Sequence, residues 1–579
     1  MAKRDYSSWG KEELIKEIEL LRRRKKYGLV WEDKPEDVVE RCKSELPILE
    51  EVKNKAIILD QDKPMNLLIE GDNYHALSVL NYTHKGKIDV IYIDPPYNTG
   101  ATNWKYNNAY IDKEDSYKHS KFASYIYHRI KLAKPLLKTT GVIICAIDDF
   151  EVQNVRHIFD DIFGENNRMG TVVVIHNPGG RQDEKFFPTS HEYMLIYGKN
   201  VAEINLGTLE VSSKKIDEYK YEDSFSRYKL REFRRSGANS RRQERPNLWY
   251  PIYIHPITLA LSLSFIEGYD EILPIDKDNV ERVWRWNAKT LMDKKDEYID
   301  IKKIKNGYRL YVKERMTDNN GEKPKSFWFK PEYSATNGTS ALKKIFYDRN
   351  DKIFDFPKSP FLIKDILKIT ATNPYAIVLD YFAGSGTTGQ AILELNTDGG
   401  KRKFILCTNN ELLDEQEKTL REQGLSEEII QSYGVCQAVT YPRIERVIKG
   451  YPGAEGITAN LKYFKTSFVP ADPTDKNKIA LTEKATEMLC IKEDTFEEVK
   501  STKQYTIFRN KKRYTGIIFD QQAIDEFKKE VTKIDGKFSL YIFSLGDDTF
   551  DEEFEDMNKK VKLSPIPEAI LRVYRRIFK

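Results

Sequence analysis

The chain has 579 residues, of which 94 are basic and 90 acidic, so its net charge of +4 points to no particular class of partner. With 40% hydrophobic residues it can bury real cores, and its length suits about three or four domains. It has no apolar run long enough to cross a bilayer, its first residues lack a signal-peptide core, and its five cysteines have neither disulfide nor metal-ligand spacing, which excludes a membrane span, a disulfide scaffold and a zinc site.

Residues 11–26 predict an amphipathic helix within an N-terminal helical arm that spans residues 1–35. Its apolar stripe consists of Leu14, Ile18 and Leu21, and its last residues are basic. A basic helix end either complements the helix dipole in solvent or contacts phosphate, and the solvated end is the more common case.

A strand is predicted over residues 66–72, and it ends in Gly71 and Asp72. Asp is a preferred N-cap residue, and a helix is expected to begin near Tyr74. A carboxylate at the carboxyl end of a strand can also accept the amino group of a bound adenosyl ring. Asp72 therefore has two possible roles, as a helix cap and as a ligand contact.

The apolar, β-branched run 88–93 predicts a buried strand that ends in the stiff loop Asp94-Pro95-Pro96-Tyr97. Two prolines can continue neither a sheet ladder nor a helix. Ligands of open α/β sheets bind at the carboxyl ends of strands. There Asp94 and the Pro95 carbonyl can accept the two hydrogens of an exocyclic amine, while Tyr97 stacks on its ring. The alternative is a tight turn in which Tyr97 is only a packing residue.

Helical and strand patterns alternate beyond this loop, which predicts an α/β fold with a mostly parallel sheet. Asp148 and Asp149 favour a helix cap over a metal site, because no further ligands accompany them. A helix is predicted over 119–137, and strands over 141–147, 171–175 and 193–197.

The composition changes after about residue 200, and a basic stretch lies between residues 227 and 245. It holds eight basic and two acidic side chains, a local excess of six. Such a run is usually a solvated face, and a phosphate-binding surface is the alternative. The candidate phosphate-contacting residues are Arg227, Lys229, Arg231, Arg234, Arg235, Arg241, Arg242 and Arg245.

A glycine-rich loop follows a short apolar strand at 376–379 and precedes a helix predicted over 388–395. Its glycines permit a sharp turn and a close approach of a ligand to the backbone, and the helix N-terminus presents N–H groups to an anion. Residues 384–389 also fit the dinucleotide pattern G-x-G-x-x-G, with Glu411 as a possible ribose partner. The candidate cofactor-binding residues are Asp380, Phe382, Ala383, Gly384, Ser385, Gly386 and Thr387.

The last segment, residues 469–579, predicts a small α+β domain without a catalytic motif. Strand-like patterns over 503–508 and 514–519 flank a basic turn, and 565–578 predicts a basic amphipathic helix. This domain is expected to dock either a second copy of the chain or another subunit.

Together the two loops resemble those of DNA adenine-N6 methyltransferases that use S-adenosylmethionine. Asp380 follows Asp94 by 286 residues, which resembles the permuted motif order of the β class. The resemblance covers roughly residues 10–470, and further stretches resemble the modification (Mod) subunits of type III restriction–modification systems. These stretches are 69–77, 94–100, 191–193 and 461–466.

The resemblance implies a Rossmann-like S-adenosylmethionine-dependent methyltransferase fold with circularly permuted motifs and an inserted target-recognition domain. It divides the chain after the arm into a first methyltransferase half (36–200), a target-recognition and DNA-binding region (201–345), a second methyltransferase half (346–468) and the C-terminal interaction domain (469–579).

For the cofactor, the resemblance implies contacts from Asp72, Lys358 and Glu411 beside the glycine loop. Lys358 lies in a stretch, 356–363, that resembles the family's support for the methionine end, where its ammonium can meet a carboxylate. Glu411 is displaced from the expected position after the strand 404–407 because three residues intervene. This departure leaves its ribose contact open.

For catalysis, the resemblance implies that Asp94, Pro95, Pro96 and Tyr97 act on an adenine flipped out of double-stranded DNA, without a metal. The expected partners are double-stranded DNA, a second copy of the chain and a helicase–nuclease restriction subunit, in a bacterial cytoplasm at the nucleoid. An orphan adenine or cytosine-N4 methyltransferase, a non-catalytic DNA-reading subunit and a nicotinamide or flavin oxidoreductase stay open. Asp rather than Ser at position 94 favours adenine over cytosine.

Overall fold

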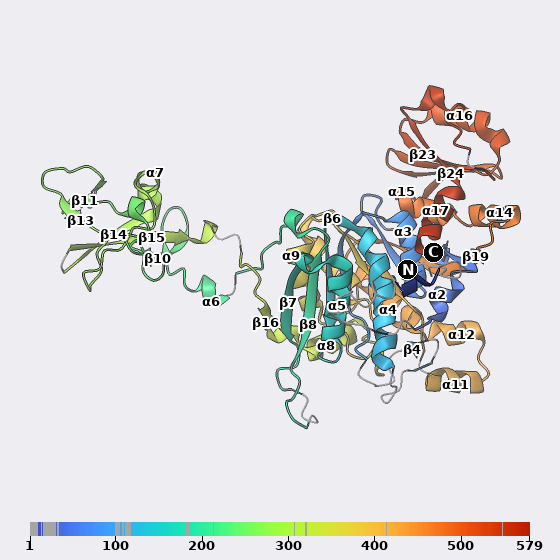
Figure 1. Cartoon of the computed structure of the whole chain (residues 1–579), viewed down its shortest axis with the longest axis horizontal. Helices are drawn as coiled ribbons and strands as arrows, with labels where there is room; N and C mark the ends of the chain where they lie inside the picture. The colour runs from blue at the N-terminus through green and yellow to red at the C-terminus, as the bar shows by residue number, and fades with distance from the viewer. Residues whose placement is uncertain are drawn as a thin grey trace. The chain divides into compact units, whose positions relative to one another are not determined.

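The computed structural model of the chain forms two compact units, one of Met1–Gly207 with Lys325–Lys579 and one of Thr208–Pro324 (Figure 1). Most of the helix predicted over 11–26 lies outside the described residues. No described helix combines the length and the hydrophobicity needed to cross a bilayer. The structure describes residues 10–12, 14–15, 31, 34–98, 105–106, 109–110, 117–180, 185–211, 213–305, 307–318, 321–412, 414–546 and 548–578.

The described part of the first unit is built on a ten-stranded sheet. Its strands pair in parallel from β19 to β6, whereas β1 and β8 pair antiparallel with their neighbours. This confirms the predicted α/β fold with a mostly parallel sheet. The strand order is β1 (Glu45–Glu51), β19 (Asn460–Pro470), β2 (Met65–Glu70), β18 (Lys403–Thr408), β17 (Ile377–Asp380), β3 (Ile88–Ile93), β6 (Leu137–Ile147), β8 (His191–Gly198), β7 (Arg168–Ile175) and β16 (Phe327–Trp328).

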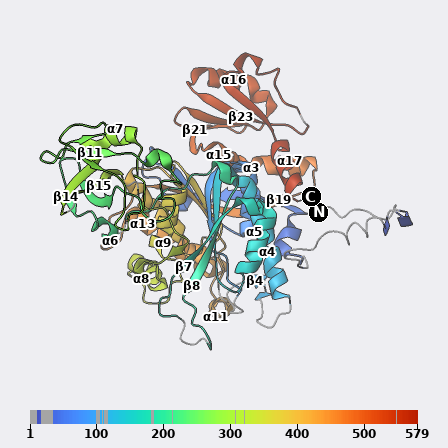
Figure 2. The ribbon, with the colours of Figure 1, turned by 60° about the vertical axis from the view of Figure 1, so that its left-hand side comes forward.

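Helices cover both faces of this sheet, which is why its central strands are mostly apolar (Figure 2). The crossovers β3–α4–β6 and β17–α10–β18 run in opposite directions along the sheet, so right-handed connections place their helices on opposite faces. One face carries α3 (Asn73–Thr83), α4 (Lys118–Ala133) and α5 (Val152–Phe163), and the other carries α9 (Pro360–Thr370), α10 (Thr387–Leu395) and α13 (Tyr441–Lys449).

The chain direction along the sheet reverses between β3 and β17. These strands are parallel neighbours, with Val378 opposite Val90 and Leu379 opposite Ile91. From β3 the chain continues to β6 on one side, and from β17 it continues to β18 on the other. Crevices for ligands form at the carboxyl ends of strands where such a reversal occurs.

The second unit contains a four-stranded antiparallel sheet, a three-stranded sheet and the helix α7 (Ala288–Tyr298). Phe233, Trp284 and Leu310 lie in its own buried core. The predicted region 201–345 extends beyond this unit at both ends. Residues 201–207 and 325–345 belong to the first unit, and β16 in the second of these segments pairs with β7 there. Its larger sheet has the order β14 (Ile299–Ile304), β15 (Gly307–Arg315), β10 (Arg227–Glu232) and β9 (Tyr221–Glu222).

The C-terminal segment forms a five-stranded sheet that remains part of the first compact unit. Its last helix, α17 (Glu568–Ile577), packs against α3. The hydroxyl of Tyr574 donates a hydrogen bond to the Pro47 carbonyl on β1. The predicted strands around the basic turn are β21 (Tyr505–Asn510) and β22 (Arg513–Ile518), which pair antiparallel.

A buried arginine on α4 ties three elements together beneath the strand end of β2. The Arg129 guanidinium donates to both carboxylate oxygens of Glu36, at 2.6 and 3.0 Å, and its Nη2 lies 3.4 Å from Asp72. Burial works against the charged form of Glu36, but Arg129 and His128 together more than offset it and lower the pKa of Glu36 to about 2. Arg129 also donates to Asn73, the first residue of α3.

Arg129→Met should lower the free energy of unfolding by about 3–5 kcal/mol, because it leaves Glu36 buried without its counter-ion. Urea denaturation at neutral pH measures the loss. Lys138→Met is the matched control, since its pair with Asp89 is partly exposed and should be worth at most about 1 kcal/mol. Equal losses in the two variants would contradict the structural role given to Arg129.

Candidate active site at the carboxyl edge of the sheet

The carboxyl ends of four neighbouring parallel strands carry acidic residues. Asp72 follows β2, Glu411 follows β18, Asp380 ends β17 and Asp94 follows β3. Because the strands are parallel, these ends meet at one edge of the sheet. The structure therefore brings the Asp94 loop and the glycine loop side by side, although 286 residues separate Asp94 from Asp380.

Asp94 belongs to a compact group of four side chains. The Tyr97 hydroxyl donates to Asp94 Oδ1 at 2.7 Å, and it lies 3.1 Å from Glu192 Oε2. The Lys358 ammonium lies 3.1 Å from Asp94 Oδ1 and donates to Glu192 Oε2 at 2.9 Å. It also donates to the Tyr97 hydroxyl and sits 4.7 Å from the centre of the Tyr97 ring. The group fixes the orientation of Tyr97 and of one Asp94 oxygen.

The charges of this group are unequal, since two carboxylates share one ammonium. Burial raises the pKa of Asp94, with Lys358 opposing and Glu192 adding to the rise. Burial also disfavours the charged form of Glu192, but Lys358 is close enough to hold its pKa below the usual range. Lys358 stays protonated, because the two carboxylates outweigh its burial and raise its pKa.

The second carboxylate oxygen of Asp94 is available to a ligand. Both hydrogen-bonding contacts of its side chain with described residues are made by Oδ1. The Asp94 side chain keeps 25% of its surface exposed, whereas Glu192 keeps 3%. Asp94 Oδ2 can therefore accept a hydrogen from outside the protein, while Glu192 is enclosed behind it.

The glycine loop turns its backbone toward the sheet edge. Gly384 and Gly386 have φ values of 46° and 79°, and Gly386 is the N-cap of α10. The side chains of Ser385 and Thr387 both accept hydrogen bonds from Arg443 Nη1, at 2.9 and 2.8 Å, so they point to the protein interior. Ala383 N–H is already bonded to the Cys407 carbonyl. Backbone rather than side chains is thus what this loop offers to a ligand.

Arg443 on α13 supports the glycine loop, and the sequence analysis does not identify it. It is fully buried beneath the glycine loop and also donates to the Ser385 carbonyl and to Gln390. Burial lowers its pKa to about 9, and no carboxylate of a described residue lies within ion-pair distance of it. The amphipathic pattern of α13 places it on the buried face, which is the signal that could have identified it.

Asp72, Glu411 and Phe382 line the neighbouring part of the edge. Asp72 caps α3, since its Oδ1 accepts the Tyr74 N–H at 2.7 Å, as one of the two predicted roles requires. The Phe382 ring packs on Tyr125 at 6.0 Å between centroids. Burial raises the pKa of Tyr125, and the nearby charge of Glu411 adds to the rise.

The structure places the Lys358 ammonium between Asp94 and Glu192. Its predicted contact with the carboxylate of a cofactor stays a prediction. The segment before α9 brings the lysine beside the Asp94 loop. Glu192 belongs to a stretch that carries the family resemblance, but no role is predicted for it. A carboxylate inside an apolar strand is the signal that could have revealed one.

The predicted DNA-contacting residues lie in the second unit and fall into two groups. Five of them have partners there: Arg227 donates to the Tyr219 carbonyl, Lys229 pairs with Glu218, Arg231 with Glu314, Arg234 with Glu232 and Arg242 with Glu281. The guanidinium groups of Arg235, Arg241 and Arg245 have no carboxylate partner among the described residues. Both Arg241 and Arg245 are exposed.

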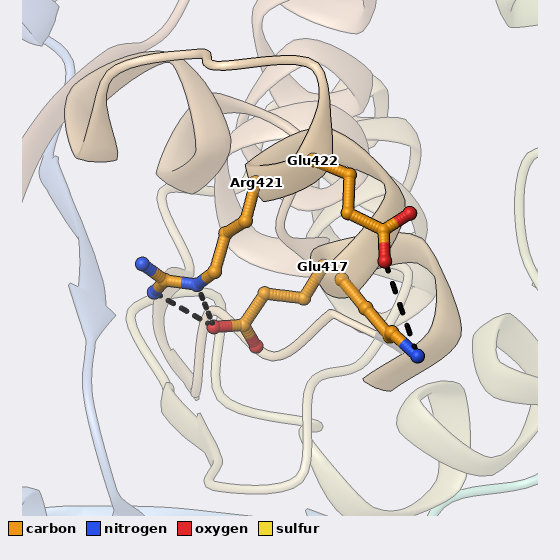
Figure 3. A pocket seen from close by; sticks show the side chains of 4 residues that line it. Glu417, Arg421 and Glu422 are labelled. Atoms are coloured by element: carbon orange, nitrogen blue, oxygen red, sulfur yellow. Dashed lines mark hydrogen bonds and ion pairs between the residues drawn. The ribbon is translucent and has the colours of Figure 1, made fainter.

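A separate pocket on α11 (Asp414–Glu422) offers less chemistry (Figure 3). Its four lining side chains are charged and pair with one another. Arg421 contacts Glu417 at 2.9 Å, and Lys418 contacts Glu422 at 3.9 Å. These solvated pairs neutralise each other, so the sheet edge remains the candidate site.

Asp380 should make the unfolding free energy depend on pH. Burial raises the pKa of Asp380 to about 7, even though Thr388 and the Phe382 N–H bond its carboxylate. The ionised form is therefore less stable in the folded chain, and stability is lost as pH rises through about 7. Relative to Asp380→Asn, the wild type should lose up to about 3 kcal/mol between pH 5 and pH 9 in urea denaturation. A difference that does not change with pH would contradict this.

Comparisons with known proteins agree with the site. The family model of the DNA methylases matches residues 88–417, a span that includes both loops. The chain is 31% identical to the type III restriction–modification enzyme EcoPI Mod subunit of Escherichia phage P1, over 76% of this chain and 70% of that protein. It is 34% identical to the type II methyltransferase M.KpnI of Klebsiella pneumoniae, over 62% of this chain and 84% of that protein.

Among solved structures, the M1.HpyAVI–SAM complex covers 60% of this chain and 94% of its own, at 16% identity and a TM-score of 0.26. That score is too low to add to the assignment, which rests on the sequence matches. Because the family match spans both loops, a dinucleotide oxidoreductase built on the glycine loop alone is excluded. The chain therefore belongs to the DNA methylase family, and it is a DNA methyltransferase that resembles the Mod subunits of type III restriction–modification systems.

Proposed function

We propose that the chain transfers a methyl group from S-adenosylmethionine to the N6 amino group of adenine in double-stranded DNA. The observation that carries the proposal is Asp94, which has one oxygen held by Tyr97 and Lys358 and the other available. It lies at the sheet edge that it shares with the glycine loop. An amine acceptor and a nucleoside-binding loop are the two parts that methyl transfer needs side by side.

The residues beside the glycine loop suit S-adenosylmethionine. The carboxylates of Asp72 and Glu411 match its hydroxyl and ammonium groups, and Phe382 provides an apolar surface for its ring. Gly384 has no side chain, and a Cβ there would come within 3.1 Å of the Phe354 ring. When bound, S-adenosylmethionine supplies a methyl group activated by a sulfonium. Because Lys358 is held at Asp94, the chain's contact with the methionine carboxylate is assigned to the loop backbone instead.

Asp94 acts on the acceptor nitrogen. The lone pair of an adenine amine is conjugated into the ring, so the nitrogen becomes tetrahedral as it reacts. Asp94 Oδ2 and the Pro95 carbonyl accept the two amine hydrogens and favour that geometry. After the transfer, Asp94 Oδ2 can take the surplus proton of the nitrogen. Aspartate rather than serine at this position favours adenine over cytosine.

The target base has to leave the DNA helix to reach this edge. A stacked adenine cannot place its amine against Asp94, so the base is flipped out and stacks on Tyr97. Hydrogen bonds of the Tyr97 hydroxyl hold the ring in place for this contact. Pro95 and Pro96 keep the loop stiff, which lowers the entropy cost of ordering it on binding.

The second unit is proposed to hold the DNA. Phosphate contacts require cations that are not neutralised within the protein. Arg235, Arg241 and Arg245 meet this condition, and so does Arg227, whose guanidinium donates to the neutral Tyr219 carbonyl. Lys229, Arg231, Arg234 and Arg242 are paired with carboxylates of the same unit. The unpaired arginines are therefore the ones assigned to phosphate.

The partners follow from the relatives. Type III Mod subunits are by name parts of a larger enzyme, so we assign to this chain a helicase–nuclease restriction subunit and a second copy of itself as partners. The C-terminal sheet is the proposed docking element. These proposals place the chain on DNA in a bacterial cytoplasm.

Asp94→Ala should lose at least about 10³-fold in methyl transfer while keeping its affinity for DNA, because the variant lacks the acceptor for the amine hydrogens. Incorporation of labelled methyl groups measures the first property and fluorescence anisotropy the second. Single-molecule sequencing of DNA from cells that express the wild type reports the modified base and its sequence context. Methylation by Asp94→Ala at the wild-type rate, or N4-methylcytosine as the product, would contradict the proposal.

Arg241→Ala and Arg245→Ala should each reduce the slope of log K against log salt concentration by about 0.9, because each removes one phosphate contact. Titrations of labelled duplex at several salt concentrations give the slope. Arg242→Ala is the matched control, since its guanidinium pairs with Glu281 and lies over Trp249. A larger change of slope in Arg242→Ala would reverse the assignment.

A further inference from the structure

Glu192 occupies a costly position for a carboxylate. It lies on β8, two strands away from β3, and it is 2% exposed. Its neighbours along the strand include Met194, Leu195 and Ile196, which are buried. A charged group in such surroundings is retained only when it is well paired. Glu192 is paired with Lys358, so the two residues are held in place together.

Glu192 and Lys358 are not an isolated ion pair. Lys358 arrives from the segment before α9 and contacts Asp94 Oδ1 as well as Glu192 Oε2. The Tyr97 hydroxyl bridges the same two carboxylates. An ion pair with only a structural role would need no third member. Here the third member is Asp94, the partly exposed acceptor of the reaction. The ammonium is therefore built into the site as the counter-ion of Asp94.

Glu192 has a carboxylate oxygen that can accept a further hydrogen bond from the Lys358 ammonium. Its Oε1 is buried and has no hydrogen-bond partner among the described residues. When an amine hydrogen comes to Asp94, the Lys358 ammonium can shift toward Glu192 without losing all of its bonds. This suits a site in which the positive charge has to stay near Asp94 and still make room for a base.

The other described groups that face Asp94 are polar, and none of them is a second ammonium or guanidinium. Tyr92 on β3, Cys145 on β6 and Asp380 on β17 lie near it, and His176 faces Glu192 from the end of β7. Tyr92 and Cys145 stay neutral because burial raises their pKa values. Among the described residues that face it, Lys358 is the ammonium that stabilises the Asp94 carboxylate, and Glu192 opposes that effect at close range.

We infer that Glu192 and Lys358 are positioning residues that set the charge of Asp94, and with it the lower pH limit of methyl transfer. The inference rests on the proposed function, in which Asp94 has to be ionised to accept the amine hydrogens. The positive charge of Lys358 favours ionisation of Asp94, and the negative charge of Glu192 disfavours it. Removal of each charge should therefore move the acid limb of the pH–rate profile in opposite directions.

The experiment measures single-turnover methylation of duplex DNA between pH 4.5 and 9 with saturating S-adenosylmethionine. Glu192→Gln keeps the shape and one acceptor oxygen, and its acid limb should move to lower pH by about one unit. Lys358→Met removes the cation, and its acid limb should move to higher pH by about one unit or more. Lys358→Arg keeps the charge and should keep the limb near that of the wild type. Lys364→Met on α9, whose partner is Glu394 at 3.0 Å, is the control and should not move it.

The outcomes separate the two proposals. If the wild type methylates no DNA, the proposed function fails, whatever the variants do. If the wild type is active and both variants lose rate without opposite shifts of the acid limb, Glu192 and Lys358 have only a structural role and the inference is overturned. Urea denaturation reports whether Lys358→Met is folded, and if it is not, the direction of the shift in Glu192→Gln decides.

Discussion

Parallel pairing between β17 and β3 joins parts of the chain that lie almost three hundred residues apart, through the rungs Val378–Val90 and Leu379–Ile91. Because these strands are parallel neighbours, the loops after them lie at the same edge of the sheet. Asp94 and the glycine loop are thus brought together by main-chain hydrogen bonds in a buried sheet. Such bonds hold the distance between the two loops more firmly than surface contacts between separate domains could.

This arrangement gathers acidic groups at one edge, and the fold has to counter their mutual repulsion. Long cationic side chains do so from elements that are remote in sequence. Arg129 reaches Asp72 and Glu36 from α4, and Lys358 reaches Asp94 and Glu192 from the segment before α9. Arg443 has another task, since it bonds the inner side of the glycine loop and so leaves the outer side to a ligand. In each case the cation is buried or nearly so, which makes its contribution insensitive to salt.

Much of this could be predicted from sequence, and the reasons for success and failure are physical. The strands 88–93 and 141–147 and the loops after them follow from apolar runs broken by proline or glycine, which are local signals. The adjacency of Asp94 and Asp380 follows from motif order together with the family resemblance. The contacts of Lys358, Glu192 and Arg443 could not be predicted, because they depend on which side chains meet in space after several crossovers. Lys358 shows the difficulty well, since one ammonium would suit either a cofactor carboxylate or the carboxylates that it actually contacts.

Both segments that connect the first unit to the second are hydrogen-bonded within the first unit. The Gly207 N–H donates to the Ile369 carbonyl on α9 where the chain leaves, and β16 pairs with β7 where it returns. No described strand of the inserted unit takes part in the main sheet, so its core can change without altering the Asp94 loop or the glycine loop. With the DNA-binding role proposed for this insert, its replacement by recombination would give a descendant enzyme with the same reaction and a new recognition sequence, which is a route by which one catalytic scaffold can diversify in its choice of DNA.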